Sequence, residues 1–104
     1  MNVDLVAARN DWEQGYARLL EEARDPVHGE RLHAQLEVVT AELRRRVGGT
    51  FTLRELAEAD VNADSWAREA VADHAPFPGW PRTLAVVGDA AFYIYARAAV
   101  DYSP

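Results

Sequence analysis

Cysteine and lysine are both absent from this chain of 104 residues. Without cysteine the chain can form neither a disulfide bond nor a thiolate metal site, and a cytosolic location is the default expectation. No apolar run reaches the roughly 18 residues that a membrane span needs, so we expect neither a membrane-spanning helix nor a signal peptide. Serine occurs only at Ser65 and Ser103, and no glycine-rich phosphate loop is present. Nucleophilic catalysis therefore has no motif to build on.

The charge balance is acidic, with a net charge of −6, which argues against a domain that grips a phosphate backbone. All 11 basic residues are arginine, a usage typical of GC-rich bacterial genomes. The hydrophobic fraction of 49% is ordinary for a globular protein. A chain of this length is expected to form a single domain, residues 1–104.

Apolar spacings of three and four predict a first helix over residues 3–24, capped by Asn2 or Asp4. Gly15 lies close to its apolar face, where it can let a neighbouring helix approach closely. The opposite side is expected to face solvent and is polar: Asp11, Gln14, Arg18 and Glu21.

Residues that typically begin or end helices predict the next two helices. Asp25-Pro26 is a natural helix start, and Gly48-Gly49 a natural stop, for a second helix that ends near Val47. Thr52 to Glu55 is typical of a capping box that opens a third helix. An unbroken third helix would bring Asp60 and Asp64 onto its apolar face, so we expect a break near Asp60–Asp64.

A proline-rich connector, residues 75–81, separates this region from a final helix that is expected to run from Pro81 to about Asp101. Val87, Ala91 and Ile94 are among its predicted core residues. The predicted fold is therefore all-α, a compact four-helix bundle with the third helix broken near Asp60–Asp64.

The final helix carries a second apolar stripe opposite the first, at Val86, Tyr93 and Val100. A surface helix normally has one apolar stripe, so the second indicates either a partner surface or a helix enclosed by its own domain. On the first alternative, a homodimer or a larger protein partner would contact this helix and the connector. The predicted partner-binding residues are Val86, Tyr93, Val100, Asp89, Arg97, Phe77 and Trp80.

Asp60 and Asp64 form a possible acid site, because burial raises the pKa of a carboxyl group and so makes a general acid. The spacing Asp60-x-Asn62-x-Asp64 also matches the start of a calcium-binding loop, but Val71 stands where such a loop needs a glutamate. The sequence therefore predicts neither a metal site nor a cofactor. A small-molecule ligand for a pocket around the two aspartates remains an alternative.

The segment Phe51-Thr52-Leu53-Arg54-Glu55-Leu56-Ala57-Glu58-Ala59 resembles the first helix of bacterial helix-turn-helix regulators. The resemblance implies DNA binding through a second helix over residues 64–74. There Arg68 is surrounded by Asp64, Glu69 and Asp73, which would repel phosphates, and nucleic acid is an unlikely partner.

These observations favour a small cytosolic interaction or regulatory module, self-associating through its C-terminal helix, over an enzyme. The alternative is a ligand-binding or acid–base catalytic bundle that uses Asp60 and Asp64. DNA binding by a helix-turn-helix-like unit ranks third.

Overall fold

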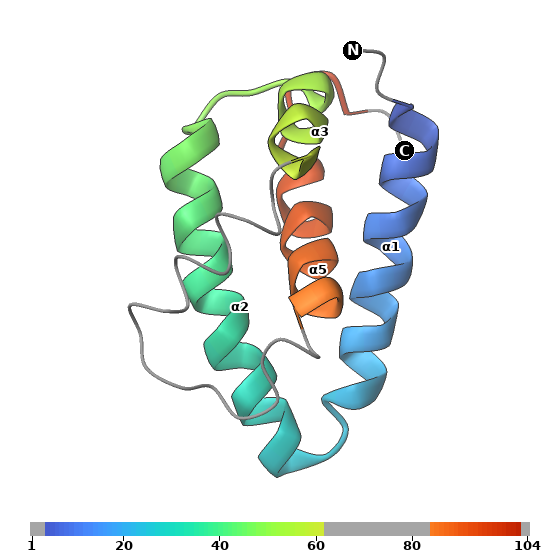
Figure 1. The fold of residues 1–104 in the computed structure, drawn as a ribbon, viewed down its shortest axis with the longest axis vertical. Coiled ribbons are helices and arrows are strands. Elements are labelled where there is room, and N and C mark those ends of the chain that lie inside the picture. The colour runs from blue at the N-terminus through green and yellow to red at the C-terminus, as the bar shows by residue number, and fades with distance from the viewer. Residues whose placement is uncertain (1–3, 62–83, 103–104) are drawn as a thin grey trace.

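The computed structural model describes residues 4–61 and 84–102. These ranges contain four helices: α1 Leu5–Glu22, α2 Pro26–Val47, α3 Leu53–Val61 and α5 Leu84–Ala96 (Figure 1). No strand occurs in them. The prediction of an all-α four-helix bundle is confirmed. None of the helices in the described ranges is both long enough and apolar enough to cross a lipid bilayer.

The first two helices begin where their capping residues predict. The Asp4 carboxylate accepts a hydrogen bond from the Ala7 backbone N–H at 3.0 Å, which caps α1. The Asp25 carboxylate accepts one from the Val27 N–H at 3.0 Å, and Pro26 opens α2. Each cap satisfies a backbone donor that has no partner within its own helix.

The connection from α2 to α3 also follows its local sequence. Gly48 ends α2 with a φ of 79°, a conformation that glycine adopts without steric cost. The Glu55 N–H donates to the Thr52 hydroxyl at 3.1 Å, and the Thr52 N–H donates to the Glu55 carboxylate at 3.2 Å. This reciprocal pair is the predicted capping box.

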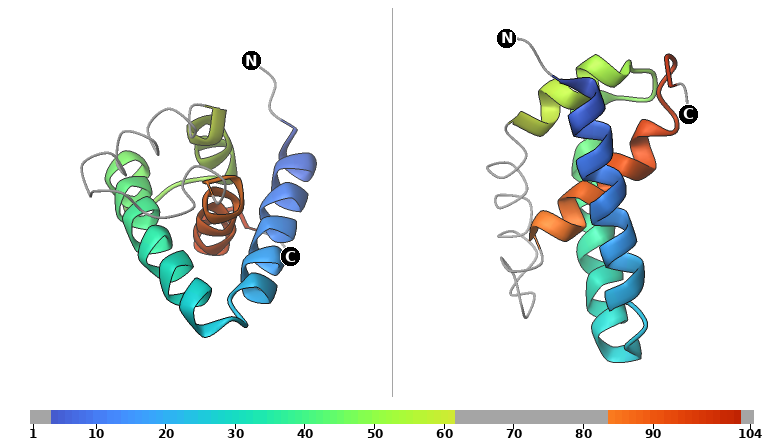
Figure 2. Two further views of the ribbon diagram at one scale, coloured as in Figure 1. Left: turned by 60° about the horizontal axis from the view of Figure 1, so that its bottom comes forward. Right: turned by 90° about the vertical axis from the view of Figure 1, so that its right-hand side faces the viewer.

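Helix α5 runs between α1 and α2, as Figures 1 and 2 show from three directions. Its most extensive packing is against α1. There Trp12 stacks on Phe92 with ring centroids 5.4 Å apart, and Tyr16 stacks on Tyr93 at 4.8 Å. The second apolar stripe is divided: Val86 is buried at 7% exposure, Tyr93 is half-buried, and Val100 is exposed.

The end of the last helix differs from the prediction. Helix α5 ends at Ala96, five residues before Asp101, and the chain continues in turns. Two long-range hydrogen bonds hold these turns against the start of α3: the Val100 N–H donates to the Phe51 carbonyl at 3.0 Å, and the Leu53 N–H donates to the Asp101 carboxylate at 2.7 Å. The core assignment of Ile94 is wrong, since 40% of it is exposed.

Helix α3 is described from Leu53 to Val61 and is helical at Asp60. The rest of the predicted break near Asp60–Asp64 lies outside the described residues. Asp64 and the proline-rich connector lie outside the described residues.

Helix α1 approaches α5 closely at Gly15, which is buried. A Cβ atom built at Gly15 would overlap the Cβ atom of Asp89 on α5. The absence of a side chain at this position therefore sets the separation of the two helices, as the position of Gly15 near the apolar face predicts.

We predict that Gly15→Ala lowers the free energy of unfolding by about 1–3 kcal/mol, because the added methyl group forces α1 and α5 apart. Gly88→Ala is the matched control within α5. Among the described residues no atom lies within 4 Å of a Cβ built there, so alanine should stabilise the helix by about 0.5–1 kcal/mol. Urea denaturation followed by circular dichroism measures both changes. Equal effects of the two substitutions would contradict the close approach.

Candidate functional site

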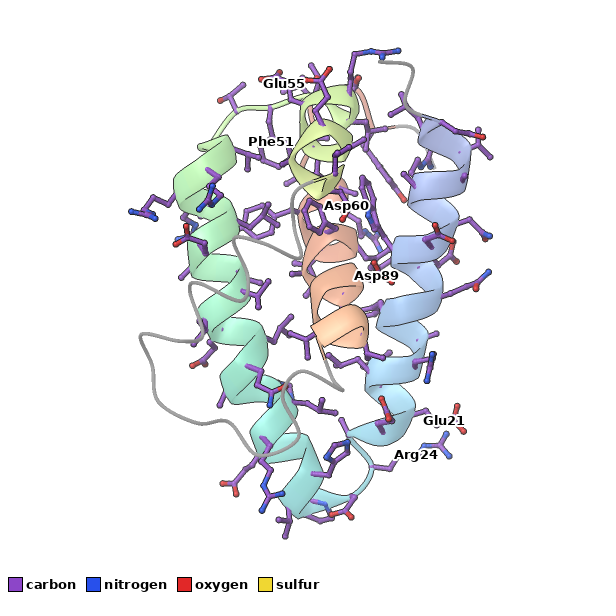
Figure 3. The ribbon with its side chains drawn as sticks, viewed as in Figure 1. Glu21, Arg24, Phe51, Glu55, Asp60 and Asp89 are labelled. Carbon is purple, nitrogen blue, oxygen red and sulfur yellow. The ribbon has the colours of Figure 1, made fainter. Side chains whose placement is uncertain are left out.

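A cleft with a volume of about 200 Å³ opens between α1, α3 and α5. We call it the acidic cleft, because three of its lining side chains are aspartates from three different helices. Figure 3 shows two of these aspartates, Asp60 and Asp89, on the α1 side of α5. The lining residues are Asp11, Gln14, Gly15, Arg18, Asp60, Val86 and Asp89.

One wall of the acidic cleft comes from a single face of α1. Asp11, Gln14 and Arg18 are spaced by three and four residues, which places their side chains in a row along the helix. The sequence predicts this row as the solvent-facing side of the first helix. In the structure the row borders a concave surface, because α3 and the N-terminal half of α5 flank it.

Asp60 is anchored by a tryptophan of the core. The indole Nε1–H of Trp12 donates to the Asp60 carboxylate at 2.9 Å, and no part of Trp12 is exposed. A hydrogen bond to a carboxylate favours its charged form and fixes its position. Asp60 is thus half-buried, and the hydrogen bond from Trp12 fixes the position of its carboxyl group at the cleft.

Asp89 is held in a less favourable environment. Burial raises the pKa of its carboxyl group from 3.8 to about 6, and the negative charges of Asp60 and Asp11 add to the increase. Its backbone position is fixed by the close approach of Gly15. Ionised Asp89 therefore lies beside two other carboxylates in a partly desolvated cleft.

This arrangement can do two things chemically. It can hold a positively charged group, which would offset the repulsion among the three carboxylates. It can also take up or release a proton near neutral pH through Asp89. Within the described residues, no three acidic or histidine side chains are grouped so that they could hold a metal ion.

The other predicted site residues are distributed differently. Val86 lines the acidic cleft, and Tyr93 is half-buried against Tyr16. Arg97 and Val100 are exposed near the C-terminal end of the described chain. Phe77, Trp80 and Asp64 lie outside the described residues, as does the second helix of the helix-turn-helix resemblance.

Asp89 is predicted at the margin of a partner surface, and in the structure it lies against α1 at Gly15 and lines the acidic cleft. The sequence pattern does not indicate Asp11, Gln14 and Arg18 as site residues. Gly15 is the one sequence signal for them, because a glycine in a helix face marks where another helix approaches.

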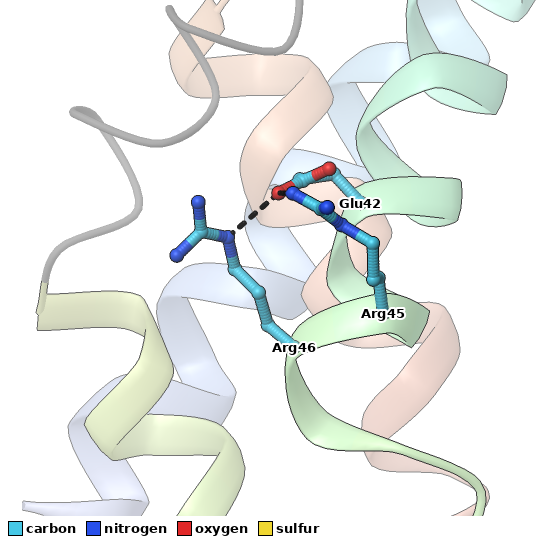
Figure 4. A network of polar contacts seen from close by, with 3 residues as sticks. All are labelled: Glu42, Arg45 and Arg46. Atoms are coloured by element: carbon cyan, nitrogen blue, oxygen red, sulfur yellow. Dashed lines mark hydrogen bonds and ion pairs between the residues drawn. The ribbon is translucent and has the colours of Figure 1, made fainter.

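The arginines at the end of α2 are engaged within the protein (Figure 4). Arg45 and Arg46 bind the Glu42 carboxylate at 2.7 and 2.9 Å. The hydrogen bond from Arg45 lowers the pKa of Glu42. The Arg44 Nε–H donates to the Tyr95 hydroxyl at 3.1 Å. These contacts and the negative end of the helix dipole account for the cluster.

Comparison with known protein families, with characterised proteins and with solved structures finds no match to this chain.

We predict that Asp89→Asn stabilises the protein above pH 6. In the folded protein the raised pKa favours the protonated form of Asp89. The contribution of this form to the free energy of unfolding is fully present below about pH 4 and is lost as the pH rises through about 6. Asparagine resembles the protonated acid at every pH. The difference in free energy of unfolding between variant and wild type should grow from near zero at pH 4 to about 1–2 kcal/mol at pH 7, after allowance for solvent screening.

Urea denaturation of both proteins at pH 4, 5, 6 and 7 measures this difference directly. The same difference at all four values would show that Asp89 does not titrate in this range.

Proposed function

We propose that the protein is a small binding module whose acidic cleft takes one ammonium or guanidinium group. The observation that carries the proposal is the electrostatic environment of Asp89. Its pKa is raised first by burial and then by the charges of Asp60 and Asp11. Three aspartates and one arginine, Arg18, line the cleft, so acidic groups outnumber basic ones there. A bound cation would relieve that excess, and charge-assisted hydrogen bonds would orient it.

The size of the acidic cleft supports a small bound group. Its volume of about 200 Å³ lies below the range of about 300–1,000 Å³ that is usual for drug-sized ligands. It suits the charged end of one aliphatic chain. That chain can belong to a free amine or to a basic side chain of a protein partner, and the chemistry recognised in the cleft is the same.

The test is a titration with butylguanidine, which stays charged at every pH used, followed by NMR chemical shifts of the backbone amides at pH 8. We predict saturable shifts at residues around the cleft, including Gly15 and Asp89. Asp60→Asn keeps an acceptor for the Trp12 N–H but removes a negative charge, and should weaken binding about tenfold.

Glu37→Gln is the matched control, because Glu37 is exposed on α2 and does not line the cleft. It makes the same change in net charge and should leave the affinity unchanged. Equal weakening by both variants would mean that the cation responds only to net charge. A second titration, with an acetylated tripeptide that carries arginine between two glycines, distinguishes the sources: tighter binding than butylguanidine favours a protein partner.

A second candidate function is self-association through the C-terminal segment. It is supported by apolar side chains that the fold leaves accessible beyond the middle of α5: Ile94 is 40% exposed and Val100 is 66% exposed. The proposed occupant of this surface is a second copy of the chain, since homodimers are the commonest oligomers. Arg97, exposed between the two, would lie at the rim.

For this candidate we predict a dimer in solution that Val100→Asp converts to a folded monomer, because a carboxylate cannot be buried in an apolar contact without a partner. Light scattering coupled to size exclusion measures the molar mass. Val6→Asp is the control, since Val6 is a 79% exposed valine on α1. A monomeric wild type would contradict self-association and would leave the proposal for the acidic cleft unchanged.

A further inference from the structure

Residues 97–101, which follow α5, have the composition of a helix but are not part of one. They comprise an arginine and two alanines, which are strong helix formers, followed by valine and aspartate, and none of them is glycine or proline. The sequence pattern accordingly predicts a helix as far as Asp101. In the structure α5 ends at Ala96, and the residues after it form turns. Local sequence and folded structure therefore disagree over this segment.

The backbone hydrogen bonds of the segment explain the disagreement. A continuous helix would direct the Val100 N–H to the Ala96 carbonyl, four residues earlier. In the structure the Ala96 carbonyl accepts from the Ala99 N–H at 3.1 Å instead. The Val100 N–H donates to the Phe51 carbonyl at 3.0 Å. Docking of the segment on Phe51 and continuation of α5 therefore exclude each other, because both need the Val100 N–H.

Two further contacts hold the docked turns. The Leu53 N–H, at the start of α3, donates to the Asp101 carboxylate at 2.7 Å. This N–H has no acceptor within its own helix, and a hydrogen bond to a charged group is stronger than one between neutral groups. The guanidinium group of Arg9 lies over the ring of Tyr102, 4.8 Å from its centroid.

The docked turns bury few side chains. Ala99 is buried and Tyr102 is half-buried, whereas Val100 is 66% exposed and Asp101 is exposed. A segment with few buried apolar contacts and partly exposed hydrogen bonds is the kind that opens locally, while the rest of the fold stays intact. Docking therefore depends mainly on the hydrogen bonds to the start of α3.

We infer that residues 97–101 are a two-state switch. In one state they dock as turns on the start of α3, and in the other they lengthen α5 by about 7.5 Å of helix. The helical state places Val100 two turns beyond Tyr93 on the same side of α5, and it leaves the Leu53 N–H without Asp101. The switch therefore decides which form of this segment a partner meets, and a partner that binds one form better shifts the balance toward it. The acidic cleft plays no part in this inference.

NMR spectroscopy of Asp101→Ala tests the switch, because this substitution removes the acceptor for Leu53 and introduces the best helix former. The Cα chemical shifts of residues 97–101 should move to helical values. The Leu53 amide should exchange with solvent about tenfold faster, since it loses a hydrogen bond to a charged group. Asp101→Asn is the matched control: it removes the same charge but keeps an oxygen acceptor, and should retain the docked turns. The indole N–H resonance of Trp12 checks that each variant is folded.

Chemical exchange saturation transfer on the wild type is the second measurement. It should detect a minor state in which the Val100 shifts match those of Asp101→Ala. If Asp101→Ala does not fold, this measurement decides alone, and a wild type without a helical minor state overturns the inference. Turn-like or random-coil shifts at residues 97–101 in folded Asp101→Ala also overturn it. So do helical shifts in Asp101→Asn, because docking would then not depend on the hydrogen bond to Leu53.

Discussion

The close approach of α1 to α5 at Gly15 is the constraint on which the rest of the bundle depends. Without a side chain at this point, the two helices come near enough for Trp12 to stack on Phe92 and for Tyr16 to stack on Tyr93. The same approach turns the Trp12 indole toward α3, where its N–H reaches Asp60. One glycine thus supports the largest helix contact and the polar link to a third helix.

Local signals predict the fold well where the cause is local. The helix starts at Asp4, at Asp25 and at the Thr52–Glu55 capping box are each decided by hydrogen bonds within a few residues. The end of α5 is decided elsewhere. Beyond Ala96 the final turns are held by two hydrogen bonds, from the Val100 N–H to the Phe51 carbonyl and from the Leu53 N–H to the Asp101 carboxylate, about fifty residues away in sequence. No residue near Ala96 signals that end.

The acidic cleft shows a second limit of pattern analysis. A helical wheel gives the direction of Asp11 and Asp89 from their own helix axes, but not which neighbouring helix each direction meets. Asp60 was identified because an acid within an apolar face is unusual on its own helix. Asp89 was assigned to an outer margin, because α5 has apolar residues on most sides and its sequence does not distinguish the side that α1 covers.

Asp89 is an unfavourable residue for the partly buried position that it occupies. The Cβ atom of Asp89 lies where a side chain at Gly15 would be, and alanine or asparagine would place a Cβ atom there without burying a charge. Asp60 is compensated by the Trp12 N–H, whereas the described residues that shift the pKa of Asp89 add negative charge to its surroundings. Residues that lower the stability of the fold are expected mainly at functional sites. Packing within the described residues therefore does not explain the charge of Asp89, because the described fold would be more stable without it.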